Sequence, residues 1–216
     1  MADLALSEWY DDVLPQVAGC PVVLADWAIR KAAIEFCDRS HAHIVALTGI
    51  NSVAGTADYT LTPTAGTEVV KVIGVEYDGE DIDPISPRDV SRLYGEDWAD
   101  LQEEPVHFLS QYGTSLKLIP KPATAIAAGI VPTVVTRPTA AATTIAEVIG
   151  TLYKEAIAKG ARKTLWLMPK KPWTAFERGA KEEQDFFEAC AVAHLQAHKG
   201  RTGAPTRTRN YYYPGK

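Results

Sequence analysis

The sequence predicts an α+β fold: a helical bundle, an antiparallel β-domain inserted into it, and an extended C-terminal arm. Three observations lead to this prediction: helical periodicity toward both ends, strand patterns with hairpin turns between them, and a basic ending rich in glycine and proline. We expect residues 1–43 and 139–200 to form the bundle, 44–138 the β-domain and 201–216 the arm. Because helices and strands are segregated along the chain, the helices should pack on one another rather than on both faces of a sheet.

Two helices are predicted before residue 43. A short one covers residues 6–17 and ends near Gly19, and a longer one runs from Pro21 to Ser40, where proline suits the first turn. Opposite charges four residues apart predict a solvent-exposed flank on the longer helix, at Asp26–Arg30, Lys31–Glu35 and Glu35–Arg39. Its apolar stripe is expected at Leu24, Trp27, Ala28, Ile34 and Cys37.

Strand patterns begin at about residue 44. Tyr59 and Leu61 alternate with polar residues, and a β-branched run covers residues 69–73. This run leads to Asp78-Gly79, a dipeptide that favours the two-residue turn of a β-hairpin. Ile82 should therefore lie on the returning strand.

The rest of the β-domain predicts a second hairpin, one more strand and a short helix. The second hairpin covers residues 108–118 and turns at Gly113-Thr114. The strand covers residues 130–136, and its Pro132 indicates an edge position because proline has no N–H to donate. The short helix is expected over residues 87–101.

Two long helices are predicted after residue 139, each opened by a capping box. In Thr144–Glu147 and in Thr174–Glu177 a threonine precedes a glutamate by three residues, so each side chain can satisfy a free backbone N–H. The last helix should end at Gly200, a residue type favoured just past a helix end. Its buried stripe is expected at Phe176, Ala180, Phe187, Cys190, Ala191 and Leu195.

Composition favours a soluble intracellular protein. Hydrophobic residues make up 46% of the 216-residue chain, and the formal net charge of −5 argues against a general nucleic-acid-binding core. Three scattered cysteines, Cys20, Cys37 and Cys190, are too few for a disulfide framework and suggest a reducing compartment. No apolar run is long enough to span a membrane, and no basic segment of a signal peptide is seen at the N-terminus.

The end of the chain differs from the rest in charge. From residue 199 onward there are five basic residues and no acidic one; the other 17 of the 22 basic residues and all 27 acidic residues lie in residues 1–198, which carry −10. Glycine and proline exclude a helix here, and three adjacent tyrosines are costly to leave in water. We expect an arm that docks on another surface, with a basic tail of no binding role as the alternative. The expected binding residues are Arg201, Arg207, Arg209, Tyr211, Tyr212 and Tyr213.

Motifs of known catalytic classes are absent from the sequence, including the phosphate-binding loop, the nucleophile elbow and H-E-x-x-H. His194 and His198 are four residues apart on a predicted helix, as paired metal ligands require. However, Leu195 stands where a zinc hydrolase has its general base, and no third ligand is evident. Two surface histidines near a helix C-terminus are the favoured interpretation.

Two other clusters contain side chains that can bind metals. Cys37, His41 and His43 lie near a helix end, where a satisfied terminus is favoured over a ligand set. The acidic residues near the first hairpin turn lack the calcium-binding EF-hand pattern; they are Asp78, Glu80, Asp81 and Asp83. We therefore predict no catalytic residue, no metal site, no cofactor and no enzymatic activity.

Several stretches form a pattern when taken together. The helix W-A-I-R-K-A-A-I-E-F-C (27–37) is similar to an A-I-R-x-A-A-x-E-F-C motif, and residues 53–61 match V-x-G-x-x-x-Y-x-L. Residues 70–84 are similar to a V-x-x-V-x-x-D-G-x-x-L-x-P pattern, and 152–187 to a closing pair of helices. Between residues 21 and 200 the chain thus resembles the head–tail adaptor proteins of tailed bacteriophages. The segment after Cys37 departs from the family by lacking aromatic residues.

This resemblance implies a structural neck protein of the virion, assembled in the host bacterial cytoplasm and located at the head–tail junction. Such adaptors form a ring, usually twelve-fold, on the portal protein of the capsid, and they present the docking surface for a downstream tail or neck protein. Genomic DNA passes through the channel without specific binding, which an acidic body suits. The C-terminal segment extends to grip the portal, and arginine and tyrosine are frequent anchors of such interfaces. No catalytic residue is implied.

Three other functions stay open at this stage. A head-completion (stopper) or tail-terminator protein is a close variant, although long helices favour the adaptor over the β-rich terminators. A metal-dependent hydrolase could use the His194/His198 pair or the Cys37/His41/His43 cluster. The basic tail could also bind nucleic acid, but five charges would give only weak and salt-dependent attachment.

Overall fold

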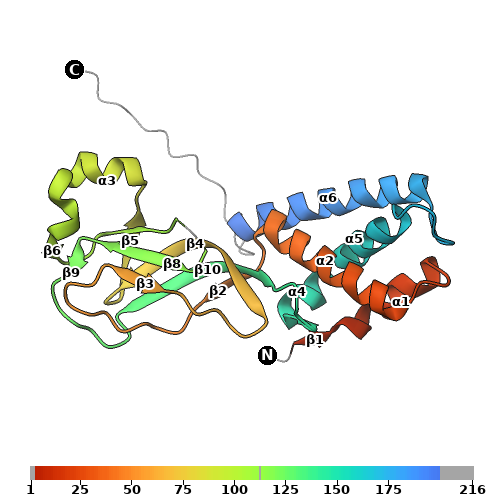
Figure 1. Ribbon diagram of the computed structural model, residues 1–216, viewed down its shortest axis with the longest axis horizontal. Helices are drawn as coiled ribbons and strands as arrows, with labels where there is room; N and C mark the ends of the chain where they lie inside the picture. Colours follow the sequence, from red (N-terminus) through yellow and green to blue (C-terminus); the bar gives the residue numbers. More distant parts are fainter. Residues whose placement is uncertain (1–2, 112, 200–216) are drawn as a thin grey trace, which may run out of the picture.

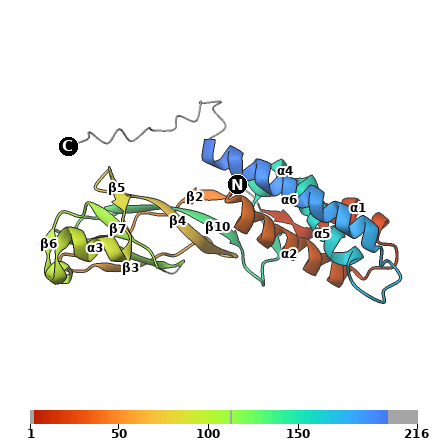
Figure 2. The same cartoon turned by 90° about the horizontal axis from the view of Figure 1, so that it is seen from above.

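The computed structural model describes residues 3–111 and 113–199 and has two parts joined end to end (Figures 1 and 2). The helical body is made of helices from both ends of the chain. The sheet body is a curled seven-stranded sheet with a short helix at its far end. Each body has its own hydrophobic core. The predicted α+β class is confirmed.

The N-terminal elements of the helical body follow the prediction. They are β1 (Leu4–Ala5), η1 (Leu6–Trp9), α1 (Tyr10–Val13), η2 (Leu14–Gln16) and α2 (Val22–Ser40). The buried face of α2 consists mostly of small residues: Ala25, Ala28, Ile29, Ala32, Ala33, Phe36, Cys37 and Ser40. The predicted stripe is wrong at Leu24 and Ile34, which are half-buried, and at Trp27, which is 41% exposed. Alanines take the inner face because they let the neighbouring helix approach closely. Of the three predicted charge pairs, Glu35–Arg39 forms.

Helices α4 (Glu147–Leu152), α5 (Lys154–Trp166) and α6 (Phe176–Lys199) complete the helical body. Gly160 of α5 lies where α2 and α6 meet it. A Cβ at this position would stand 2.8 Å from the Cβ of Ala32 and 2.7 Å from Cε2 of Phe186. The absence of a side chain therefore sets the spacing of these three helices.

The buried stripe of α6 differs from the predicted one. Its buried residues are Gly179, Phe186, Cys190 and Ala193, whereas Phe176, Ala180, Ala191 and Leu195 are exposed. Only Cys190 is common to both sets, and Phe187 is half-buried. The sequence offers two adjacent phenylalanines, and the space at Gly160 selects Phe186.

The capping boxes do not form as predicted. Thr144 belongs to β11 (Thr144–Ile145), which pairs with β1, and its hydroxyl donates to Asp3; α4 then begins after Ala146 without a side-chain cap. The second box precedes α6, which begins at the expected place. There the Thr174 hydroxyl donates to the Met168 carbonyl at 2.6 Å and accepts from the Lys171 N–H at 2.9 Å, closing the turn before the helix.

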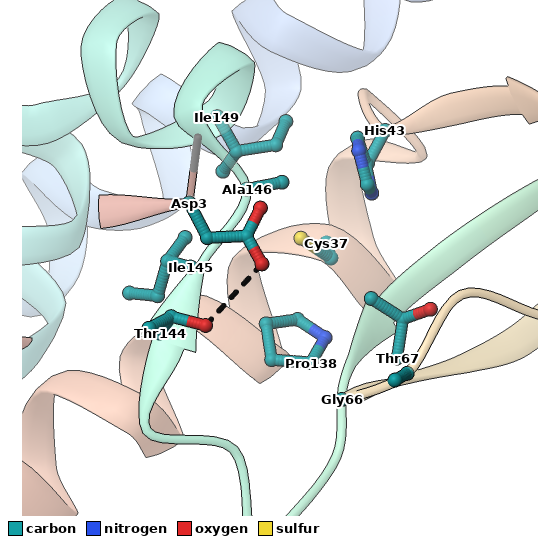
Figure 3. Close-up of a pocket in the computed structure, with 11 residues that line it drawn as sticks. Asp3, Cys37, His43, Gly66, Thr67, Pro138, Thr144, Ile145, Ala146 and Ile149 are labelled. Atoms are coloured by element: carbon teal, nitrogen blue, oxygen red, sulfur yellow. Dashed lines mark hydrogen bonds between the residues drawn. The ribbon is translucent and has the colours of Figure 1, made fainter. Parts of the chain in front are cut away.

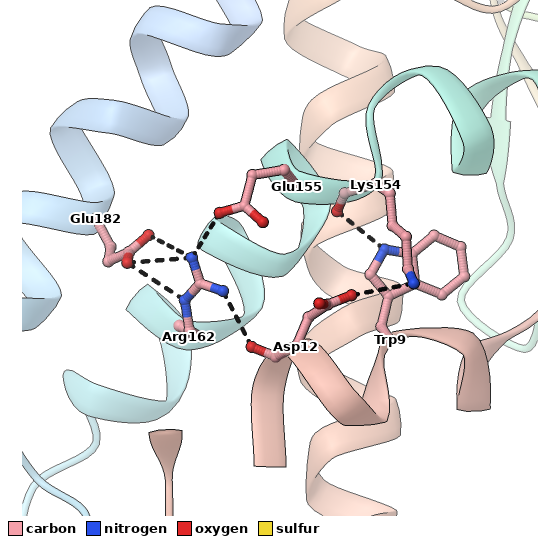
Figure 4. A network of polar contacts seen from close by, with 6 residues as sticks. All are labelled: Trp9, Asp12, Lys154, Glu155, Arg162 and Glu182. Atoms are coloured by element: carbon pink, nitrogen blue, oxygen red, sulfur yellow. Dashed lines mark hydrogen bonds and ion pairs between the residues drawn. The ribbon is translucent and has the colours of Figure 1, made fainter. Parts of the chain in front are cut away.

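A buried arginine connects α5 with the elements around it (Figure 4). The side chain of Arg162 is 10% exposed and contacts two carboxylates, Glu155 of α5 at 3.0 Å and Glu182 of α6 at 3.2 Å. It also donates to the carbonyl of Asp12 in α1 at 3.0 Å. Since its donors are shared among three elements, burial of this charge is compensated. Arg162 thereby links the two ends of the chain.

The seven strands of the sheet are ordered β2-β10-β4-β5-β7-β8-β3. They are β2 (Ile44–Ala46), β3 (Asp58–Thr60), β4 (Thr67–Tyr77), β5 (Glu80–Pro84), β7 (His107–Leu109), β8 (Ser115–Ile119) and β10 (Ile130–Pro138). All neighbours pair antiparallel except β5 and β7, which are parallel. The parallel pair is possible because a helical segment connects the two strands. β6 (Gln102–Glu103) and β9 (Lys121–Pro122) form a separate pair.

Both predicted hairpins are present. Asp78 and Gly79 have φ of 51° and 85° and close the β4–β5 hairpin, with Tyr77 opposite Glu80. Strands β7 and β8 form the second. The predicted helix at 87–101 is two pieces, α3 (Pro87–Tyr94) and η3 (Glu96–Asp100), divided at Gly95.

The edge position predicted for Pro132 is wrong, because β10 lies between β2 and β4. The Pro132 carbonyl accepts from the N–H of Leu47, one residue beyond the end of β2. The nitrogen of Pro132, which has no hydrogen to donate, therefore points toward Leu47, where β2 has already ended. A proline fits inside the sheet because its neighbour stops there.

Candidate functional site

The junction of the two bodies is held by an ion-pair clamp. Arg137 at the end of β10 contacts Asp38 of α2 at 2.5 Å and Glu68 of β4 at 2.8 Å. These three side chains are about one-third to under one-half exposed. One guanidinium therefore holds a helix of one body and a strand of the other in a fixed relation.

The pocket shown in Figure 3 is lined in part by the chain neighbours of the three clamp residues, Cys37, Thr67 and Pro138. Asp3, Cys37 and His43 lie among otherwise mostly apolar or small residues: Ala65, Gly66, Thr67, Pro138, Thr144, Ile145, Ala146 and Ile149. Burial raises the pKa of the Cys37 thiol to about 12, so that it is protonated at neutral pH. Burial lowers the pKa of His43, whose Nδ1 lies 2.7 Å from the hydroxyl of Thr136. A protonated thiol and a neutral imidazole bound to a structural threonine do not form an activated nucleophile.

The candidate metal ligands group differently from the sequence-based sets. Among the described residues, the possible ligand group is His41, His194 and His198, and it leaves out Cys37 and His43. In the sequence His41 stands close to Cys37 and His43, whereas its spatial neighbours are on α6. The acidic residues near the β4–β5 turn are exposed and do not join a ligand group within the described ranges.

The first half of α2 exposes apolar side chains that no other element covers within the described part of the chain. Val23 is 81% exposed, and Trp27 one turn later is stacked by Lys31 at 5.1 Å. A groove runs from Trp27 along α2 toward Asp38 and is closed on its other side by Leu167 and further residues of α5 and the segment after it. Exposed apolar side chains beside a groove are typical of interaction surfaces. The prediction of Trp27 as part of the apolar stripe of this helix is thus wrong.

The residues predicted to bind the portal, Arg201, Arg207, Arg209 and Tyr211 to Tyr213, lie outside the described residues. The structure does show the position of the end of α6, which precedes these residues in the chain. The last turn of α6 lies beside the end of α2, at the junction of the bodies (Figures 1 and 2). The predicted arm thus begins near the middle of the molecule.

Comparison with protein-family models identifies the family of this chain. A family model described as SU10 adaptor protein matches residues 1–209. The chain belongs to this family. SU10 adaptors are phage head–tail adaptor proteins, as the sequence resemblance indicated. No curated protein matches the chain significantly.

Family membership supports a structural role for this SU10 adaptor. It is a bacteriophage adaptor that associates with other head or tail components, and its family suggests a virion component without enzymatic function. Within residues 3–111 and 113–199, no helix combines the length and apolar character that crossing a bilayer requires.

Proposed function

We propose that this SU10 adaptor forms a twelve-fold ring between the capsid portal and the tail, and that its C-terminal residues dock on the portal. The observation that carries the proposal is the extent of the family match, which continues past α6 to residue 209. The match therefore includes Arg201, Arg207 and Arg209, although the three tyrosines follow it. A segment kept within a family model beyond the last helix is more consistent with a binding arm than with an incidental tail.

The charge distribution supports a channel for DNA. Residues 1–198 carry a formal charge of −10, and the positive excess lies in the following residues. A ring of acidic bodies repels the phosphate backbone and lets the genome pass without adhering. The basic residues would be used on the portal, where an acidic or aromatic surface can desolvate them. The same ring would offer its opposite face to a downstream tail or neck protein.

Side-to-side contacts in a closed ring use two different surfaces of each copy. One candidate is the face of α2 that exposes Val23 and Trp27. The other is the outer face of α6 at Val192 and Leu195, which are 49% and 56% exposed. Glu183 of α6 lines the groove beside α2, and Val192 follows it by nine residues, about 180° around the helix. The two apolar faces thus point in different directions, as a head-to-tail ring requires.

The proposal is tested by co-sedimentation with the assembled portal protein of the same phage. We expect the full chain to bind and a chain ending at Gly200 to lose most binding. A matched control, with Thr202, Thr206 and Thr208 replaced by serine, changes the same segment without altering its charge or aromatic content and should bind normally. Equal binding by the truncated chain would assign the contact to the bodies and refute the role of the arm. No binding by either chain would refute portal docking.

The ring contact is tested in the same assay with Val23→Asp. A charge on this exposed face should leave the fold intact but prevent neighbouring copies from packing. We therefore expect fewer copies per portal at saturation, measured by quantitative densitometry, while the isolated variant retains its thermal stability. Full occupancy by Val23→Asp would exclude the α2 face from the ring contact.

A further inference from the structure

Three histidines from two distant parts of the chain meet at the junction of the bodies. His194 and His198 lie one turn apart on α6, with ring centroids separated by 4.3 Å. His41, directly after α2, brings its ring centroid to 5.4 Å from that of His194. One nitrogen from each of the three rings lies within 4.8 Å of the others. Two of these side chains are half-buried and His198 is exposed.

The backbone at His41 is unusual and places its ring in the cluster. His41 is the C-cap of α2 and has φ 52°, a left-handed conformation that is uncommon outside glycine and that asparagine, aspartate and histidine adopt more often than other residues do. The chain turns here from the helical body toward the sheet. Glycine would be the ordinary choice for this cap, but glycine could not supply an imidazole.

His194 is already oriented by a neighbour. Its Nδ1 lies 3.2 Å from the backbone carbonyl of Ser40. A carbonyl only accepts hydrogen bonds, so Nδ1 donates and the lone pair of the neutral ring is on Nε2. Metal-bound histidines are commonly fixed in this way, by a hydrogen bond from the nitrogen that does not bind the metal.

We propose that His41, His194 and His198 form a binding site for a transition-metal dication, with Zn²⁺ the first candidate. Zn–N bonds of about 2.0–2.1 Å place the ligand nitrogens roughly 3.4 Å apart, so nitrogens that now lie up to 4.8 Å apart must approach by up to about 1.4 Å. His198 is exposed and can make such an adjustment. Three imidazoles leave one coordination position for water, and they favour zinc, cobalt, nickel or copper over magnesium or calcium, which prefer oxygen ligands.

The surroundings of His41 are compatible with this role. The pKa of His41 is lowered by burial, and further by His194, Lys71 and His198, while Asp38 opposes the shift. A lowered pKa keeps the imidazole neutral at pH 7, as a ligand must be. Lys71 is a nearby cation that would weaken metal binding. Asp38 offsets part of that repulsion, although it also pairs with Arg137.

A bound metal would fasten the last turn of α6 to the end of α2. This is the turn that precedes residues 200–216, so the metal would fix where the C-terminal segment leaves the body. The site itself does not depend on the identity of any partner of the adaptor. Its test can therefore fail while the proposed portal docking holds, and the reverse.

The experiment titrates the full chain, without any histidine tag, with Co²⁺ and follows the visible absorption of the bound ion. We expect saturation at one ion per chain and displacement by Zn²⁺. His198→Ala and His41→Asn should each weaken binding at least tenfold; asparagine is chosen because it tolerates the left-handed backbone. His107→Gln is the control, since His107 is bound to Tyr94 in the sheet body, and it should bind as the unchanged chain does.

Thermal unfolding gives a second readout. Zn²⁺ should raise the Tm of the unchanged chain and of His107→Gln but not that of His198→Ala, because a ligand stabilises the state that binds it. Absence of saturable binding by the unchanged chain overturns the site. So does tight binding that persists in both His198→Ala and His41→Asn.

Discussion

At the scale of single residues, burial controls the chemistry of the cysteines. Cys37 and Cys190 are 1% and 3% exposed in the core of the helical body, whereas Cys20 is half-buried. Burial raises the pKa of Cys37 to about 12 and that of Cys190 to about 11, with Asp38 and Glu35, respectively, adding to the shifts. The two core thiols are thus packing groups, and Cys20 is the thiol closest to solvent.

These pKa values predict a loss of stability at alkaline pH. Each thiol has a folded pKa above its unfolded value, so its contribution is complete below about pH 9 and is lost as pH rises toward 11 and 12. In that window each thiol lowers the free energy of unfolding by up to about 1.4 kcal/mol per pH unit. Urea unfolding from pH 8 to 10.5 should show a smaller decline for Cys37→Ala than for the unchanged chain.

The control for this prediction is Cys20→Ala, which should reproduce the alkaline decline of the unchanged chain because Cys20 is the least buried thiol. Comparison of the two variants also removes the effect of lysine deprotonation, which is common to both. Identical pH profiles for Cys37→Ala and Cys20→Ala would contradict a buried, protonated Cys37.

The sequence could not identify the roles of single residues whose partners are distant. No local pattern marks Arg162 as buried, yet it lies against Glu182 and the carbonyl of Asp12. The sequence groups His41 with Cys37 and His43, whereas its spatial neighbours His194 and His198 are more than 150 positions away. Helical spacing reveals pairs on one element, but a third group contributed by another element depends on how the helices pack.

At the scale of elements, the sequence was reliable where the determinants are local. The Asp78-Gly79 turn requires positive φ at both positions, and these two residues tolerate it, so the hairpin was predictable. The capping box at Thr144 failed because a short β-pair with Leu4 and Ala5 engages that segment. The prediction of the buried stripe of α6 was wrong because either Phe186 or Phe187 could lie on the buried face. The choice between them depends on the packing of the neighbouring helix.

The close packing of α2, α5 and α6 predicts that Gly160→Ala destabilises the protein. Alanine improves helix propensity by about 1 kcal/mol, but its Cβ would lie under 3.0 Å from Ala32 and Phe186. Overpacking of this kind costs about 1–3 kcal/mol, so we expect a net loss of about 1 kcal/mol in the free energy of unfolding.

Chemical denaturation measures this effect, with Gly74→Ala in β4 as the matched control. A Cβ at Gly74 meets no atom within 4 Å, and its φ is not positive, so this variant should be neutral or slightly stabilised. A Gly160→Ala variant as stable as the unchanged chain would show that the helices can separate without cost.

At the scale of the whole molecule, the two cores raise the question of how the bodies keep their relative orientation. The chain crosses between them at residues 41–43 and again at 138–146, and Arg137 pairs across the same junction with Asp38 and Glu68. Arg30 of α2 adds a hydrogen bond of 2.6 Å to the carbonyl of Ala142 in the second connection. An adaptor that stacks between other components depends on this orientation, because it sets the direction in which each body presents its surface.

We therefore expect Arg137→Ala to act on the junction more than on either core. Arg137 pairs with one carboxylate oxygen of Asp38, and the other oxygen is buried without a hydrogen-bond partner. Loss of the arginine therefore leaves a partly buried charge without its counter-ion. Because the side chains are about one-third exposed, the cost should be about 1–2 kcal/mol, below that of a fully buried pair.

Small-angle X-ray scattering should show a broader distribution of distances between the bodies, and proteases should cut faster within residues 138–146. Arg92→Ala, which removes a surface ion pair on α3, should change neither measurement. A variant with unchanged scattering and protease resistance would mean that the two chain crossings alone fix the orientation.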